Sequence, residues 1–203
     1  GPDQIVASNL FALAAMAEAE GAEVRMLPIA RDTEADLRQV FDLATGADLI
    51  VTIGGASVGD RDFAKPMFGP YGLDLLWEKV AIKPGKPVWL ARRSDKLILG
   101  LPGNPTSALV TARLFLAPLL AGLGGRNADD ATAFRTWRLG GELSASGDRE
   151  SFVLARACTE AAIPLDDQGS AGQRALASAD LLIRLPPHSR ALASGDEVQA
   201  LCF

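Results

Sequence analysis

Histidine and cysteine are scarce in this chain of 203 residues, which has one histidine, His188, and two cysteines, Cys158 and Cys202. A lone histidine in a Pro-Pro-His-Ser segment is typical of an exposed loop, so a Ser-His-Asp triad is not expected. The His/Cys spacing of a zinc site is also absent. Two cysteines do not make a disulfide framework, and we expect both to be reduced, half-buried thiols in a cytoplasmic protein.

Membrane and nucleotide-binding signatures are missing as well. No run approaches the ~18 uncharged apolar residues that a membrane helix needs. The first residues, GPDQIVASNLF, have neither a basic region nor a cleavage signature, so no secretory signal is predicted. Neither G-x-x-x-x-G-K-[ST] nor a strand-turn-helix G-x-G-x-x-G occurs, which argues against an NTPase or a dinucleotide enzyme.

The chain is acidic, with a formal net charge of -5 and a pI of about 4.9. This balance argues against a nucleic-acid partner, which requires a basic face. One stretch departs from it, because six basic residues between positions 79 and 96 stand against a single acid, Asp95. Either they form a solvated basic face or they line a pocket for a small anion. The six are Lys79, Lys83, Lys86, Arg92, Arg93 and Lys96.

The first 120 residues predict alternating helices and strands. Three helices are expected. The first begins at the Ser8-Asn9 cap and ends at Gly21, and the second begins at Thr33. The third runs from a Thr106 or Ser107 cap to about Leu120. Expected strands cover 23–29, 48–53, 75–82 and 88–101, the last containing a hairpin. The Gly-rich polar segment 122–130 is predicted to be a linker.

The remaining residues have a different pattern. Short strands are expected over 134–158 and 181–203, with one helix at about 172–179. The chain is therefore predicted to be an α/β layer domain followed by a small β-barrel-like or sandwich-like domain.

Three loops carry residues suited to binding anions. The first follows the buried strand 48–53, and glycines there permit close approach to a phosphate, although an ordinary turn has the same composition. The second is Lys83-Pro-Gly-Lys86-Pro87, in which two prolines stiffen a pair of lysines. The third, Gly100 to Ser107, precedes an apolar helix whose N-terminus attracts anions, or it is only a helix cap.

SVGDRD, KVAIKPGKP and GLPGNPTSA occur in that order, with SN at 8–9, RD at 31–32 and GDRESF at 147–152. Together they closely resemble the molybdopterin molybdenumtransferase family, which includes the E domain of gephyrin. The resemblance implies a three-layer αβα molybdopterin-binding domain at 1–125 and a small β-barrel-like domain at 126–203. It also implies a cytoplasmic enzyme of molybdenum cofactor biosynthesis.

The implied reaction inserts molybdate into adenylylated molybdopterin, with Mg²⁺-dependent hydrolysis to AMP. By resemblance, Asp32 and Asp62 bind Mg²⁺ and act in cleavage together with Lys79. The implied molybdate pocket comprises Lys83, Lys86, Pro87, Arg149 and Ser170. The residues implied to hold the nucleotide or pterin phosphate are Gly54, Gly55, Ser57, Gly59, Asp60, Pro102, Gly103, Asn104 and Ser107.

The family pattern begins earlier than this sequence does. The resemblance therefore implies a C-terminal portion that lacks the first strand of its α/β domain. Family members work as homodimers, so full activity is expected of the full-length dimer. Two alternatives remain, a non-catalytic gephyrin-like scaffold and a molybdopterin-binding adenylyltransferase-like domain. The adenylyltransferase lacks the KPGKP loop and the β domain.

Overall fold

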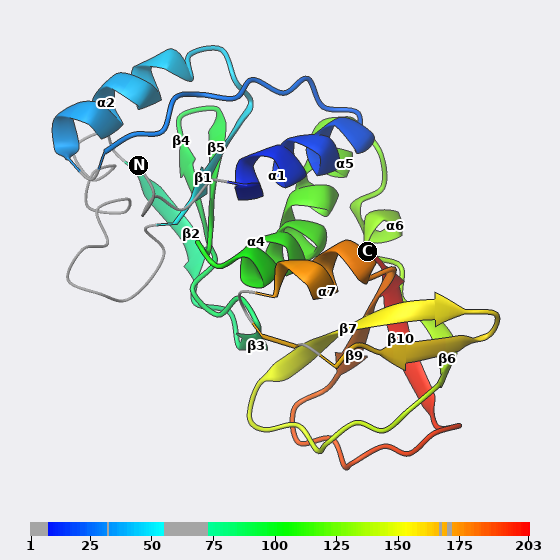
Figure 1. Ribbon diagram of the computed structural model, residues 1–203. Coiled ribbons are helices and arrows are strands. Elements are labelled where there is room, and N and C mark those ends of the chain that lie inside the picture. The colour runs from blue at the N-terminus through cyan, green and yellow to red at the C-terminus, as the bar shows by residue number, and fades with distance from the viewer. Residues whose placement is uncertain (1–7, 32, 55–72, 167, 170–171) are drawn as a thin grey trace.

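The computed structural model describes residues 8–31, 33–54, 73–166, 168–169 and 172–203 (Figure 1). It confirms an α/β domain followed by a small β-barrel. The elements of the first part are α1 (Ser8–Ala19), α2 (Glu34–Leu43), β1 (Leu49–Ile53), β2 (Asp74–Glu78), β3 (Ile82–Lys83), β4 (Trp89–Arg93), β5 (Lys96–Leu101), α4 (Pro105–Thr111), the π-helical stretch Ala112–Leu116 and α5 (Ala117–Leu123). The second part has α6 (Ala128–Ala131), β6 (Arg135–Leu139), β7 (Glu150–Cys158), β8 (Ala161–Pro164), α7 (Gln173–Ser178), β9 (Leu181–Leu185) and β10 (Glu197–Cys202).

The α/β part has the expected three layers. Its sheet has the order β1-β5-β4-β2, in which β1 and β5 are parallel and the other pairs antiparallel. Phe41 of α2 packs on one face with Trp89 and Ile98. Leu13 of α1 and Leu116 of the long helix pack on the other face with Leu99. Figure 1 shows α2 on one side of the sheet and α1 with the long helix on the other. The sheet therefore separates two apolar clusters.

The helix from Pro105 to Leu123 is long and apolar enough to cross a membrane by length and composition, with a mean hydropathy of 1.6. Half of it is buried inside the protein. Ala112, Leu116 and Ala121 are among its fully covered side chains. We interpret it as the core helix of the α/β part.

The barrel closes through the strand order β7-β8-β6-β10-β9, because β9 also pairs with β7. Its core contains Leu139, Ala155, Ile183 and Val198. A sixth strand, β3, joins β7 in parallel, with Ile82 opposite Glu150 and Lys83 opposite Ser151. The strand expected over 75–82 is thus wrong as one element. It divides at Lys79, whose φ is 57°, into β2 of the first sheet and β3 of the second.

The strand expected over 23–29 is also wrong. The segment has no strand structure, and its Met26 and Ile29 side chains are 49% and 77% exposed. Backbone N–H and C=O groups form a strand only beside a neighbour. Within the described residues the sheet ends at β1, so this segment has no strand to pair with.

Three smaller expectations need correction. The long helix begins at Pro105 after Asn104, so Thr106 and Ser107 lie inside it and are buried instead of capping it. The linker contains α6, which Asn127 caps by accepting a bond from the amide of Asp129. Both cysteines are free, as expected, but they are exposed and not half-buried.

The centre of the sheet depends on a glycine. Trp89 is fully buried and lies opposite Gly100 on the neighbouring strand. A Cβ atom built on Gly100 would overlap the indole ring of Trp89. The absence of a side chain at position 100 therefore makes the space for this tryptophan.

Replacing Gly100 by alanine is expected to destabilise the fold by about 1–3 kcal/mol, since overpacking forces the indole or the strand to move. Urea unfolding would measure the change. Gly122→Ala is the control, because Gly122 lies inside α5 with nothing within 4 Å of a new Cβ. The control should be neutral or stabilising by up to about 1 kcal/mol. Equal stability of Gly100→Ala and the parent chain would contradict this account of the core.

Candidate functional site

Two of the predicted loops meet at one edge of the sheet. Because β1 and β5 are parallel neighbours, Gly54 and the Pro102–Asn104 turn both follow carboxyl ends of strands. The amide of Gly54 donates to the carbonyl of Leu101 at 3.0 Å. A Cβ on Gly103 would lie 3.5 Å from the Cα of Gly54. Gly54 has a φ of +83°, which favours glycine at that position, whereas a Cβ on Gly103 would make only an ordinary contact with it.

The long helix points its N-terminus at the same edge. Asn104 is the N-cap, makes no side-chain capping bond, and is followed by Pro105 at the first helical position. The first amides of a helix lack intrahelical acceptors and carry the positive end of its dipole. Asn9 of α1 supports the turn by donating from Nδ2 to the carbonyl of Gly103 at 2.8 Å. This edge can therefore bind a phosphate or another anion.

We call residues Lys83 to Pro87 the lysine loop. This loop contacts both the barrel and the long helix. Its β3 strand pairs with β7, and Arg149, which precedes β7, donates from Nη1 to the carbonyl of Ile82 at 3.4 Å. Gly85 is buried with a φ of +108°, and a Cβ there would overlap the Cγ2 atom of Thr111. Lys83 and Lys86 are exposed on either side of this packed glycine. The geometry thus places Arg149 beside the lysine loop.

The loop before α7 is tied to the same helix. The hydroxyl of Thr106 donates to the carbonyl of Gly169 at 2.9 Å. The amide of Gln173 donates from Nε2 to the hydroxyl of Ser8 at 3.1 Å, which links α7 to α1. Figure 1 shows β3, α4 and α7 gathered at this junction, and Ile82, Val110 and Ala175 share one buried cluster there. Sequence reasoning missed the partners of Asn9, Thr106 and Gln173 because all three contacts are distant in sequence.

Several predicted residues lie outside the described residues, so their placement stays a prediction. They are Asp32, Gly55, Ser57, Gly59, Asp60, Asp62 and Ser170. In the part of the chain that the structure describes, no group of three or more His, Cys, Asp or Glu side chains could hold a metal ion. Lys79 is exposed at the bend between β2 and β3, where its amide donates to the carbonyl of Val88 at 3.0 Å.

The basic residues of 79–96 do not form one patch. Arg92 pairs with Asp74 at 3.0 Å, Arg93 stacks over the ring of Phe41, and Lys96 donates to the carbonyl of Ala47 at 2.8 Å. These three belong to β4 and β5 and hold neighbouring elements. The candidate anion site therefore draws on the lysines of 83–86 and on Arg149.

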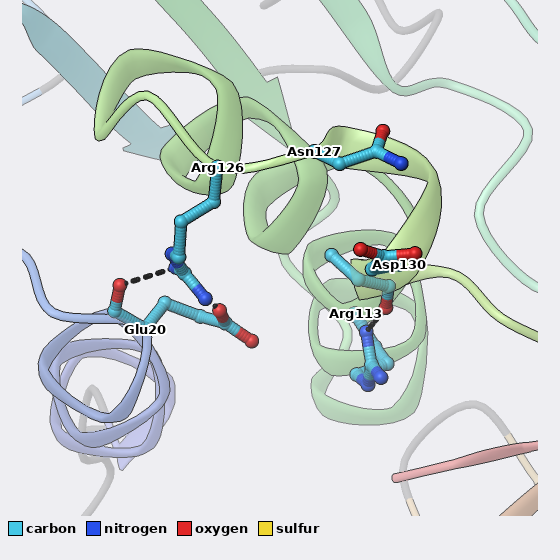
Figure 2. Close-up of a pocket in the computed structure, with 6 residues that line it drawn as sticks. Glu20, Arg113, Arg126, Asn127 and Asp130 are labelled. Atoms are coloured by element: carbon cyan, nitrogen blue, oxygen red, sulfur yellow. Dashed lines mark hydrogen bonds and ion pairs between the residues drawn. The ribbon is translucent and has the colours of Figure 1, made fainter.

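A polar cavity of about 480 Å³ lies elsewhere, and none of the predicted site residues lines it (Figure 2). Arg126 donates to the backbone carbonyl and the carboxylate of Glu20 at 2.6 and 2.9 Å. Arg113 donates to the carbonyls of Cys202 and Ala131 at 2.7 and 2.5 Å. Burial lowers the pKa of Arg113, and the nearby charge of Glu20 opposes that shift. These bonds connect α1, the long helix, α6 and β10. We therefore interpret Arg113 and Arg126 as structural residues that hold these elements together.

Arg113→Met is expected to destabilise the chain by about 2–3 kcal/mol. The substitution keeps most of the apolar stem but leaves two carbonyls without a charged donor. Arg156→Met is the control because Arg156 is exposed on β7, and it should change stability by no more than about 0.5 kcal/mol. Thermal and urea unfolding would compare the two. Equal losses of stability in both variants would show that the hydrogen bonds of Arg113 add nothing to the stability of the fold.

Two family models match the chain. The "probable molybdopterin binding domain" matches residues 2–122, and the "MoeA C-terminal region (domain IV)" matches residues 136–203. Neither match tests the predicted boundary between residues 125 and 126.

Curated relatives carry the name molybdopterin molybdenumtransferase. The chain is 35% identical to the one from Nostoc sp. over 156 residues, which are 75% of this chain and 36% of that protein. It is 41% identical to the one from Haemophilus influenzae over 124 residues, or 61% of this chain and 30% of the relative. It is 33% identical to "molybdopterin molybdenumtransferase 2" of Mycobacterium tuberculosis over 98% of this chain and 51% of the relative. The chain thus spans about half or less of these relatives.

Solved structures show the same fold. The molybdopterin biosynthesis MoeA protein of Pyrococcus horikoshii aligns with a TM-score of 0.85 and 28% identity, covering 100% of this chain and 49% of that chain. A molybdenum cofactor biosynthesis protein of Pyrococcus furiosus aligns with a TM-score of 0.78 and 19% identity, over 98% of this chain and 65% of that chain.

Proposed function

This chain belongs to the molybdopterin molybdenumtransferase family, and on that premise we propose that it acts in molybdenum cofactor biosynthesis by inserting molybdate into adenylylated molybdopterin. In the proposed reaction water cleaves the pyrophosphate bond and AMP leaves. The two dithiolene sulfurs bond to molybdenum and displace one oxide of molybdate, which leaves as water with the two thiol protons. Since the chain spans 51% or less of the curated relatives described above, we propose this activity for the complete protein.

The observation that supports the proposal best is the placement of the lysine loop. Its Gly85 packs on the long helix, its β3 strand pairs with the barrel, and Arg149 contacts its backbone. Cationic groups on separate elements are thereby held in one region before any ligand arrives. Molybdate is a doubly charged oxyanion, and charge-assisted hydrogen bonds from lysine and arginine are among the strongest available. We therefore assign Lys83, Lys86, Pro87 and Arg149 to the molybdate pocket, with Ser170 as a further proposed member.

The neighbouring edge of the sheet suits the phosphates of the nucleotide substrate. Gly54 and Gly103 lie next to each other, and Asn104 is the N-cap of the long helix, whose first amides lack intrahelical acceptors. We propose that this edge, with the glycine loop through Asp60, binds the phosphate groups. We propose Ser107, which is buried in the first turn of the helix, as a further phosphate-binding residue. Lys79 would add a positive charge from the bend before β3.

Magnesium is proposed from the resemblance. Asp32 and Asp62 would hold the ion, and Mg²⁺ would neutralise phosphate oxygens during cleavage. Both carboxylates lie outside the described residues. We also propose that the complete protein is cytoplasmic and forms a homodimer. Light scattering on the purified protein would test the dimer.

Lys83→Ala and Arg149→Ala are each expected to weaken molybdate binding by about 1–3 kcal/mol, or roughly 5- to 150-fold in Kd, because each removes a charge-assisted partner. Calorimetric titration would measure the change. Arg92→Ala is the matched control, because this arginine comes from the same basic stretch but pairs with Asp74 on the hairpin. Unchanged affinity in both test variants would count decisively against the assigned pocket.

Asp62→Asn is expected to spare molybdate binding and to slow AMP release, because the proposed role of this carboxylate is in pyrophosphate cleavage. Molybdate-dependent AMP release from adenylylated molybdopterin, followed on the complete protein, is the direct assay. Release by the parent protein would separate the enzyme from a non-catalytic scaffold. A folded Asp62→Asn variant that no longer binds molybdate would show that Asp62 contributes to molybdate binding, contrary to the proposed role in cleavage alone.

A further inference from the structure

We infer that Thr106 is a positioning residue for the oxyanion pocket, and that its hydroxyl fixes the loop before α7 relative to the lysine loop. This inference rests on the proposed function. Thr106 is the second residue of α4 and only 2% exposed. The N-cap of the helix is Asn104, and the hydroxyl of Thr106 donates to the carbonyl of Gly169, which is 63 residues away in the barrel part of the chain.

The loop around Gly169 is anchored from several directions. On the barrel side, the side chain of Gln168 makes two bonds to the backbone of Leu154. Its Oε1 accepts from the N–H of Leu154 at 2.9 Å, and its Nε2 donates to the carbonyl of Leu154 at 3.0 Å. Within the loop, the amide of Gly172 donates to the carbonyl of Gly169 at 3.0 Å. The carbonyl of Gly169 thus accepts one bond from its own loop and one from Thr106 of the α/β part. Ser170, which is proposed to contact molybdate, follows Gly169 directly in the sequence.

The helix that carries Thr106 also supports the lysine loop. Thr111 presents its Cγ2 methyl to Gly85, while its hydroxyl donates to the carbonyls of Ser107 and Ala108 in the same helix. The hydroxyls of these two buried threonines therefore bond to different parts of the chain. Thr106 reaches across to the barrel, whereas the hydroxyl bonds of Thr111 stay within the helix. Because both loops rest on this one helix, its first two turns set their separation.

This arrangement matters for binding a small ion. An oxyanion held from two loops binds tightly when both loops are in place beforehand, since ordering them on binding costs free energy. Without the Thr106 hydroxyl, the loop keeps its barrel anchor but loses the bond that Thr106 donates from α4. The affinity for molybdate should therefore fall, even though Thr106 itself is buried and is not proposed to touch the ion.

The test compares Thr106→Val with Thr106→Ser and Thr136→Val. Valine has nearly the shape of threonine and lacks the donor, whereas serine keeps it. Calorimetric titration with sodium molybdate should give a Kd that is about three- to tenfold weaker for Thr106→Val, as expected for one lost hydrogen bond, and close to the parent value for Thr106→Ser. Thr136→Val is the control, because it removes a hydroxyl that accepts from Nε2 of Gln199 at 2.8 Å on β6, a strand that carries none of the assigned pocket residues, so its Kd should not change.

Hydrogen exchange of the peptide covering 166–173 is a second measurement that needs no ligand. Exchange there should rise in Thr106→Val and stay at the parent level in Thr136→Val. A parent-like Kd and exchange in Thr106→Val would overturn the inference, as would an equal loss of affinity in Thr136→Val. Thr106→Ala serves as the test variant where the valine protein does not fold. Absence of molybdate binding by the complete parent protein would overturn the proposed function, whereas parent-like exchange in Thr106→Val would overturn the positioning role of Thr106 alone.

Discussion

The pairing of β3 with β7 is the constraint on which the candidate site depends. Residues 82–83 leave the α/β sheet and enter the barrel sheet, so the two parts of the chain share a ladder. Ile82, Val110, Phe152 and Leu182 from both parts close one apolar cluster behind it. The lysine loop follows this short strand directly. Its position is therefore set by hydrogen bonds and burial in both parts of the chain.

The long helix complements that ladder. Its N-terminus lies at the sheet edge where the turns of Gly54 and Gly103 meet, and its first turns hold Gly85 on one side and Gly169 on the other. Glycine at position 85 is needed because the chain has a positive φ there and touches Thr111. One helix thus carries its N-terminus at the sheet edge and contacts Gly85 of the lysine loop further along. Such a preformed region suits an oxyanion better than an uncharged ligand.

Local patterns predicted much of this structure. The Thr33 cap, the strand ending at Ile53, the β4–β5 hairpin and the short helix α7 depend on nearby residues, and the structure contains all four. The failures involve distant partners. The segment 23–29 has a strand-like pattern but no neighbour, and the division of 75–82 follows from pairing with Glu150. Likewise, the KPGKP and GLPGNP motifs predicted a set of anion-binding side chains, but nothing in the local sequence showed that Thr106 contacts Gly169.

The central claim is that the described parts of the chain, together with the Ser170 loop, form an oxyanion pocket. Calorimetric titration of the unmodified chain with molybdate and tungstate, with sulfate as the control anion, tests it most directly. The account predicts saturable binding of molybdate and tungstate at one site, with sulfate much weaker. Equal affinity for all three anions, or no heat of binding for any of them, would contradict it.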